Sequence, residues 1–166
     1  MPIEIERRFL VSGFDWKKYS KSKKNIKQSY LTSNKDEWAV RIRIIDEKDA
    51  WITLKKFKQK SINHEFEYRI PFKEAKSIHL LSSFHITKQR YYLSINEQDW
   101  IVDYFQDNNH PLIIAEIELK ELRENIQIPK WCQQEITGNH LLSNASLARH
   151  PIKFWAPEEL QQINLK

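Results

Sequence analysis

Short runs of this chain alternate between charged and apolar residues, the pattern of a β-strand with one polar and one apolar face. From Ile3 to Val11, for example, Glu4, Glu6 and Arg8 share one face and mostly apolar residues share the other. The alternation predicts eight strands, over Ile3–Val11, Ile26–Thr32, Glu37–Asp46, Ala50–Lys58, Glu65–Pro71, His85–Ile95, Asp99–Phe105 and Leu112–Leu122.

The segments between these strands predict antiparallel pairing and few helices. Polar connections such as Asp46–Asp49 and Asn96–Gln98 are short enough for hairpins. Apolar residues recur at helical spacing in Phe72–Ser83, and Pro157 opens a short terminal helix. The lysine-rich stretch Trp16–Lys27 is interpreted as a solvated helix-loop segment, in preference to a mouth that attracts polyanions.

The charged faces carry pairs of like charge two residues apart, about 6.5–7 Å along a strand. These pairs are Glu4/Glu6, Arg41/Arg43, Glu65/Glu67, Lys88/Arg90 and Glu116/Glu118. An open sheet with a solvated ionic face is the ordinary alternative, but solvated faces usually intersperse the two signs. The segregation of positive and negative charges along the strands favours a mainly β (α+β) fold, a closed eight-stranded antiparallel barrel with an ionic lumen. We expect Phe72–Ser83 and the C-terminal tail to cover its outside.

Length and composition limit the class of protein. The 166 residues fit a single domain, 1–166, and the net charge of +5 favours anionic ligands. Two glycines cannot form a glycine-rich phosphate loop, so side chains must hold any phosphate. One cysteine, no signal-like start and no long apolar run predict a cytoplasmic protein without a membrane partner. The tryptophans are not interleaved with basic pairs, so no specific nucleic-acid partner is expected. The oligomeric state stays open.

The two signs in one lumen call for two kinds of ligand. Several buried cations would repel one another without an anion, and an extended polyphosphate suits a row of such donors. Paired carboxylates suit a hard cation with oxygen ligands, Mg²⁺ or Mn²⁺. The expected chemistry is metal-assisted phosphoryl transfer.

These motifs resemble the CYTH, or triphosphate tunnel metalloenzyme, superfamily, and especially its small bacterial inorganic tripolyphosphatases. The opening Glu4-Ile5-Glu6-Arg7-Arg8 is similar to the family's ExExK signature. The resemblance continues, in the family's order, through Gln28–Leu31, Val40–Arg43, Thr53–Lys55, Glu65–Glu67, Lys88–Tyr91, Val102–Asp103, Ala115–Glu118, Glu135–Gly138 and Asn144–Ala148.

The resemblance implies hydrolysis of inorganic tripolyphosphate or a nucleoside triphosphate with Mg²⁺ or Mn²⁺ in a charged tunnel. It implies substrate binding by Arg8, Arg41, Arg43, Lys55, Lys88 and Arg90. It implies metal ligands, or residues that position water, among Glu4, Glu6, Glu65, Glu67, Asp103, Glu116 and Glu118. Glu4, Glu6, Arg8 and Lys88 are the residues expected to take part in catalysis.

Three positions depart from the family pattern. Arg8 replaces the signature lysine, Asn63 stands where relatives often have an arginine, and Leu141-Leu142 replaces a basic-aromatic pair. Two other functions therefore stay open beside hydrolysis. One is cyclase chemistry on ATP, as in class IV adenylyl cyclases, and the other is a non-catalytic module that binds polyphosphate or nucleotide phosphates.

Overall fold

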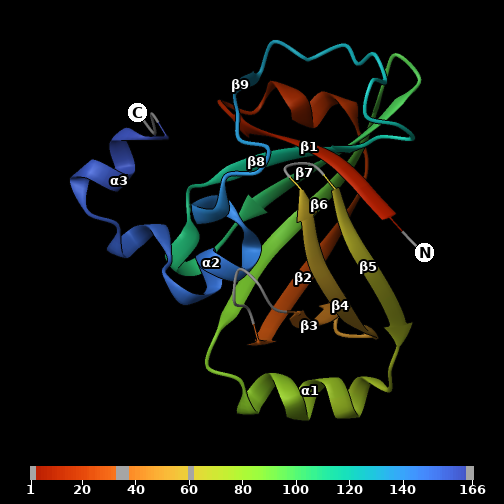
Figure 1. Cartoon of the computed structure of the whole chain (residues 1–166), viewed down its shortest axis with the longest axis vertical. Coiled ribbons are helices and arrows are strands. Elements are labelled where there is room, and N and C mark those ends of the chain that lie inside the picture. The colour runs from red at the N-terminus through yellow and green to blue at the C-terminus, as the bar shows by residue number, and fades with distance from the viewer. Residues whose placement is uncertain (1–2, 33–37, 60–61, 164–166) are drawn as a thin grey trace.

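The computed structural model describes residues 3–32, 38–59 and 62–163, and in this part of the chain the fold is a closed antiparallel β-barrel (Figure 1). Its strands are β1 Ile3–Val11, β2 Ser20–Thr32, β3 Ala39–Ile45, β4 Asp49–Gln59, β5 Ile62–Arg69, β6 His85–Ile95, β7 Gln98–Phe105, β8 Ile113–Glu118 and β9 Cys132–Glu135. The order β5-β4-β3-β2-β6-β7-β8-β1 closes on itself because β1 also pairs with β5. The predicted eight-stranded barrel is thus confirmed, with β9 as one added strand.

Strand β1 closes the ring because it is long enough to pair with three partners. Its first residues, Ile3 to Ile5, pair with β5, while Glu6 onward pairs with β8. Beyond the contact with β5, Phe9 and Val11 pair with β9. This strand therefore brings residues from the beginning, middle and end of the chain to one wall of the barrel.

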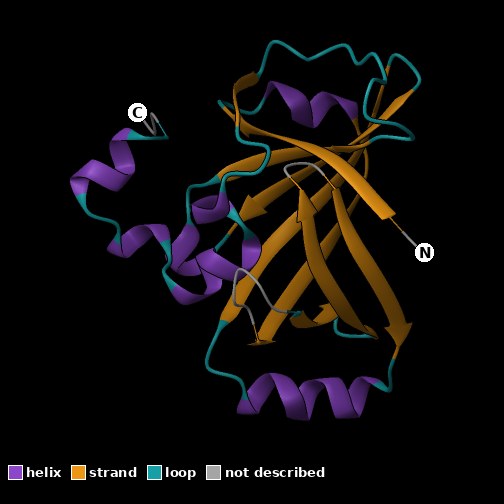
Figure 2. Ribbon diagram, in the orientation of Figure 1, coloured by secondary structure: helices purple, strands orange, loops and turns teal. Residues whose placement is uncertain are grey.

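Helices and turns cover the apolar outer face in separate places (Figure 2). Helix α1, Phe72–Leu81, places Ala75 against Ile42 and Ile44 on β3, as the predicted outer helix should. On another side, the 3₁₀ turn Asp15–Tyr19 buries Trp16 completely. It belongs to a cluster with Trp100 and Trp131 over β1 and β6–β8. These contacts leave the opposite, ionic face of each strand turned inward.

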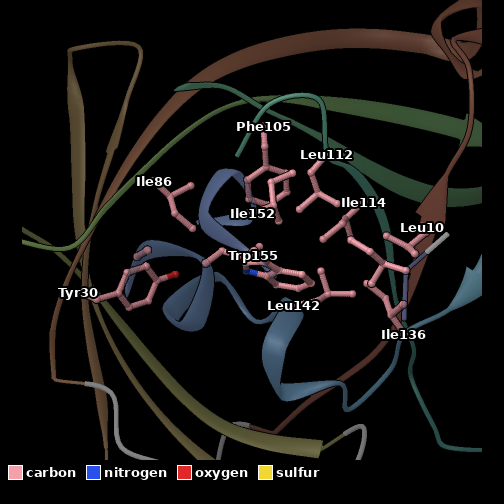
Figure 3. Close-up of a cluster of buried hydrophobic side chains, with 13 residues drawn as sticks. Leu10, Tyr30, Ile86, Phe105, Leu112, Ile114, Ile136, Leu142, Ile152 and Trp155 are labelled. Atoms are coloured by element: carbon pink, nitrogen blue, oxygen red, sulfur yellow. The ribbon is translucent and has the colours of Figure 1, made fainter. Parts of the chain in front are cut away.

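The C-terminal tail lies at the end of the lumen, which corrects the expectation that it covers the outside. Leu10, Ile86 and Ile114 continue the inward faces that carry Arg8, Lys88 and Glu116, and they are buried. The tail includes helices α2, Asn144–Arg149, and α3, Pro157–Gln161. Side chains on and near α2 pack on those inward residues, and Figure 3 shows Leu142, Ile152 and Trp155 filling the opening between the strands. An apolar plug therefore bounds the ionic part of the lumen.

The lysine-rich stretch is exposed, as expected, but most of it is strand and not the helix-loop segment that the sequence suggested. Strand β2 begins at Ser20, so Lys21, Lys23 and Lys24 belong to the barrel wall, and Lys23 and Lys24 pair with residues of β6. Their exposed side chains hide the strand alternation in the sequence. Glu37, the predicted start of the third strand, lies outside the described residues. No helix in the described part of the chain has the length and apolar character needed to cross a membrane.

Candidate functional site in the barrel lumen

The lumen encloses a cavity of about 400 Å³. Eleven of the residues predicted from the sequence line it: Glu4, Glu6, Arg8, Arg41, Arg43, Lys55, Glu65, Glu67, Arg90, Glu116 and Glu118. The other two, Lys88 and Asp103, are fully buried beside the cavity and do not line it. The structure therefore decides between the two sheet arrangements in favour of an ionic lumen.

Strand register explains why these side chains meet. Antiparallel pairing places Lys55 opposite Glu65 and Thr53 opposite Glu67. On the other wall, Arg8 lies opposite Glu116. Directly opposed side chains share a face and lie within contact distance. Glu65 and Glu116 therefore gain neighbours of the other sign across the sheet, whereas Glu6 lies opposite Glu118, a residue of its own sign.

Four glutamates, Glu4, Glu6, Glu65 and Glu118, form a group that we call the carboxylate cluster. Lys55 contacts three of them: it donates a short hydrogen bond to Glu4, and its Nζ lies 3.8 Å from Glu6 Oε1 and 3.4 Å from Glu65 Oε2. Arg41 also reaches Glu65, at 3.8 Å. The four carboxylates are therefore only partly neutralised by the nearby cations, Lys55 and Arg41.

The pKa values of the cluster reflect this excess of negative charge. Burial raises the pKa of Glu6, and Glu116 and Glu4 raise it further against the attraction of Lys55. The pKa of Glu118 is raised by burial and by Glu4, Glu65 and Glu6. Burial alone would lower the pKa of Lys55, but the surrounding carboxylates raise it. The cluster is therefore a place where additional positive charge is stabilised.

A second group, which we call the Asp103 network, has the opposite balance. Both oxygens of Asp103 accept from Arg90, through Nε and Nη2 at 2.7 Å each. Lys88 Nζ also donates to Asp103 at 2.5 Å. Glu116 accepts from Arg8 Nε at 3.0 Å and from Arg90 Nη2 at 3.2 Å. Here two carboxylates share three cations.

This abundance of partners lowers the carboxylate pKa values in the network. Burial would raise the pKa of Asp103, but Arg90 and Lys88 hold it well below its usual range. The pKa of Glu116 is lowered in the same way, with Arg8 and Arg90 outweighing burial and the nearby Asp103. Burial and Arg90 lower the pKa of Lys88 to about 8 against the attraction of Asp103. The carboxylates of the network are satisfied by its own cations.

Arginines of β3 line the wall between these two groups. Arg41 Nη2 donates to Thr53 Oγ1 at 3.0 Å and to Glu67 Oε1 at 3.2 Å, and Arg43 Nη2 donates to Glu67 at 2.5 Å. Burial, Arg41 and Arg90 lower the pKa of Arg43 to about 10. This wall holds more positive charge than Glu67 balances.

Three buried polar atoms of the lining have no hydrogen-bond partner: Arg8 Nη2, Arg43 Nε and Glu65 Oε2. Leaving a buried polar atom unpaired costs about 1–3 kcal/mol, and more for a charged group. Arg43 Nε is a donor in the arginine wall, Arg8 Nη2 is a donor in the Asp103 network, and Glu65 Oε2 is an acceptor in the carboxylate cluster. An anion in the cavity could accept from the two donors, and a cation at the carboxylate cluster could bind the acceptor.

Two of the residues that sequence reasoning missed hold charged side chains of the site in place. Thr53 Oγ1 donates to Glu67 at 2.8 Å and accepts from Arg41, so it fixes both side chains. Its place two residues before Lys55, on the same strand face, was the available signal. Asn144 accepts from Lys88 Nζ at 3.2 Å. That contact joins the plug to the barrel across 56 residues of chain and has no local signature.

Comparisons with known proteins agree with this geometry. The CYTH domain family model matches residues 2–151. An inorganic triphosphatase of Acetivibrio thermocellus is 35% identical over 155 residues, covering 92% of this chain and 97% of that protein.

Solved structures share the architecture. The crystal structure of the inorganic triphosphatase NE1496 has a TM-score of 0.65 and 25% identity, and the match covers 95% of this chain and 98% of that chain. A conserved hypothetical protein from Pyrococcus furiosus, with a TM-score of 0.58 and 16% identity over 98% of this chain and 91% of its own, shows the shared fold alone. The barrel, its segregated lumen and the match along nearly the whole chain lead to one conclusion: the chain belongs to the CYTH domain family.

Proposed function

We propose that this protein hydrolyses a terminal phosphoanhydride bond of inorganic tripolyphosphate or of a nucleoside triphosphate inside the barrel, with Mg²⁺ or Mn²⁺. One observation carries the proposal: a single cavity has a carboxylate cluster on one side and an arginine wall on the other. Family membership and the 35% identity to a protein called inorganic triphosphatase support the same reaction.

The donor set of the carboxylate cluster fits a divalent cation. Its ligands are oxygens, as Mg²⁺ and Mn²⁺ prefer, and Glu65 Oε2 is buried without a hydrogen bond. Among residues 3–32, 38–59 and 62–163, no three or more acidic, histidine or cysteine side chains already converge on one point as a metal site. Lys55 lies among the carboxylates instead. Glu4, Glu6, Glu65 and Glu118 are our candidates for holding the ion.

When bound, a divalent ion would supply charge neutralisation at the phosphoryl oxygens and a more acidic water. The remaining work falls to the protein's own side chains. Arg8, Arg41, Arg43 and Arg90 present guanidinium groups to the phosphates, and Arg offers paired donors to phosphate oxygens. Holding an extended triphosphate against this wall fixes its terminal phosphorus near the carboxylates. Positioning and charge stabilisation are the main needs of phosphoryl transfer.

Asp103 and Lys88 have a different role in this proposal from the one that the resemblance implies. Both Asp103 oxygens are engaged by cations, and neither residue lines the cavity. We assign Asp103 to positioning Arg90, whose guanidinium does line the cavity. Lys88 links that carboxylate to Asn144 in the plug. The network thus holds a phosphate-binding arginine rigidly.

The test is a product panel with purified protein, Mg²⁺ or Mn²⁺, and tripolyphosphate, ATP, GTP or thiamine triphosphate. Tripolyphosphate should yield orthophosphate and pyrophosphate, and a chelator should abolish the release. Glu6→Gln should also abolish it, whereas the exposed Glu121→Gln should not. No release above a metal-only blank between about pH 6 and 10 would contradict hydrolysis.

The same panel separates the two alternative functions. Cyclic AMP with pyrophosphate from ATP would identify a cyclase. Tight binding of polyphosphate in calorimetry, with no product from any substrate, would identify a non-catalytic binding module.

A further inference from the structure

Lys55 occupies an unusual position for a residue expected to bind phosphate. Its ammonium group lies among Glu4, Glu6 and Glu65, the oxygens that suit a cation, and not against the arginine wall. A cation held by these three carboxylates would need the same space. The lysine and a divalent ion cannot both occupy it.

The carboxylate cluster needs this charge when no other cation is bound. Several buried carboxylates without a counter-ion repel one another and are costly to desolvate. The single ammonium group of Lys55 contacts Glu4, Glu6 and Glu65 together, so one positive charge is shared by three carboxylates. A divalent ion brings twice the charge of an ammonium group, so it is the stronger partner for the same oxygens.

The lysine side chain has the means to leave. It is a flexible four-carbon stem with a compact charge, and 27% of its side chain is exposed to the cavity. Thr53, beside Arg41 and Glu67, lies two residues away on the same face, about 6.5–7 Å along the strand. Rotation of side-chain bonds, without movement of β4, can carry the ammonium toward that wall.

We infer that Lys55 is an exchangeable counter-ion, which neutralises the carboxylate cluster until a divalent cation displaces it and then donates to the triphosphate. The inference rests on the proposed function and adds coupling between the two ligands. Binding of the cation frees a phosphate donor, so each ligand should strengthen the binding of the other, as linkage requires. A fixed structural ion pair would give the opposite result, because its loss would only weaken the site.

The experiment is a calorimetric titration of Mn²⁺ into the protein at about pH 8, well above the ordinary carboxylate pKa, without phosphate. Lys55→Met removes the charge and keeps a linear side chain. Lys56→Met is the matched control, since Lys56 lies on the outer face of the same strand, over Trp38. We expect Lys55→Met to bind Mn²⁺ about tenfold more tightly than wild type, within the usual range of site coupling. The control should match wild type.

Equal or weaker Mn²⁺ binding by Lys55→Met, in protein whose circular dichroism is native, would overturn the inference. If Lys55→Met does not fold, Lys55→Gln replaces it in the same comparison of Mn²⁺ affinity with wild type. A second titration uses imidotriphosphate, a non-hydrolysable analogue, at fixed free Mn²⁺. Mn²⁺ should strengthen its binding more in wild type than in Lys55→Met, and equal gains would also overturn the inference.

These outcomes separate this inference from the proposed function. If wild type releases no phosphate but Lys55→Met gains Mn²⁺ affinity, hydrolysis fails and the exchange stands. If wild type hydrolyses tripolyphosphate but Lys55→Met gains no Mn²⁺ affinity, the exchange fails and hydrolysis stands.

Discussion

The carboxylate cluster and the Asp103 network are built from the same residue types in the same lumen, yet they have opposite properties. In the cluster, Lys55 is the main counter-ion for four glutamates, and the pKa of Glu6 is raised. In the network, Asp103 and Glu116 share three cations, and the pKa of each carboxylate is lowered. The carboxylates of the two groups therefore differ in their partners, and only those of the carboxylate cluster have negative charge left for a bound cation.

A buried carboxylate can therefore have either of two roles, one structural and one in ligand binding. A carboxylate fully engaged by arginine and lysine holds neighbours in place, and removing it leaves those cations unpaired. A carboxylate crowded by other carboxylates is strained in the free protein and is relieved by a bound cation. Both types line or adjoin one cavity, so burial alone would not distinguish them.

The largest expected effect breaks the network. Asp103→Asn leaves Lys88 and Arg90 buried without a full counter-charge, and removing one partner of a buried ion pair costs about 3–5 kcal/mol. Urea unfolding should show this loss. The matched control is Asp99→Asn, an exposed aspartate on the same strand, which should change stability by less than about 0.5 kcal/mol. A cost below about 1 kcal/mol for Asp103→Asn would mean that the network is not a structural unit.

The next effect concerns the arginine wall. Arg43→Met removes a guanidinium whose Nε has no partner, so we expect kcat/KM for tripolyphosphate to fall, by about 1.5–3 kcal/mol for one charged hydrogen bond. The free energy of unfolding should change little. The substitution removes the repulsion of Arg43 by Arg41 and Arg90, and this gain offsets the loss of the ion pair with Glu67. Arg69→Met, at the exposed end of β5, is the control. Unchanged kcat/KM in Arg43→Met would remove this residue from the phosphate site.

The smallest expected effect is a gain in stability on substitution of Glu6, whereas substitution of Asp103 causes a loss. The pKa of Glu6 is raised, so its charged form costs stability above that pKa, and stability is regained as the pH falls through it toward 4.5. Glu6→Gln should therefore stabilise the metal-free protein at about pH 8, by less than either change described above. The gain should vanish near pH 4. Urea unfolding at both values measures it, and destabilisation at the higher pH would contradict the account.

Asp103 gives the contrasting pH profile in the same protein. Its pKa is lowered, so its contribution is complete above its ordinary pKa, near 3.8, and is lost as the pH falls below that value. In Asp103→Asn, the acid-side loss of stability should be shallower than in wild type. Unfolding curves between about pH 2 and 5 measure this slope. An identical slope in both proteins would mean that another group controls acid unfolding.

Much of the barrel could be predicted because alternation is a local signal. Ile3–Val11 and His85–Ile95 match β1 and β6 residue for residue. The charged faces predicted the lining for the same reason, since residues two apart share a face. Strand β9, Cys132–Glu135, is too short to show alternation, and exposed lysines hide the first half of β2.

The partners of the charged side chains could not be predicted, because they depend on contacts between distant parts of the chain. Lys55 meets Glu4 across 51 residues, and Lys88 meets Asn144 across 56. The tail was misplaced for a related reason. An apolar tail residue such as Leu142 gives no sign, in the sequence, of whether it packs outside a barrel or inside its end.

The most direct test of the contrast is Mn²⁺ binding measured by calorimetry in wild type, Glu6→Gln and Glu121→Gln. We expect wild type and the exposed-surface control to bind Mn²⁺ with the same affinity, and Glu6→Gln to bind it at least about tenfold more weakly because a charged ligand is lost. Equal affinity in all three proteins, or no binding by wild type, would contradict the assignment of the carboxylate cluster as the cation site.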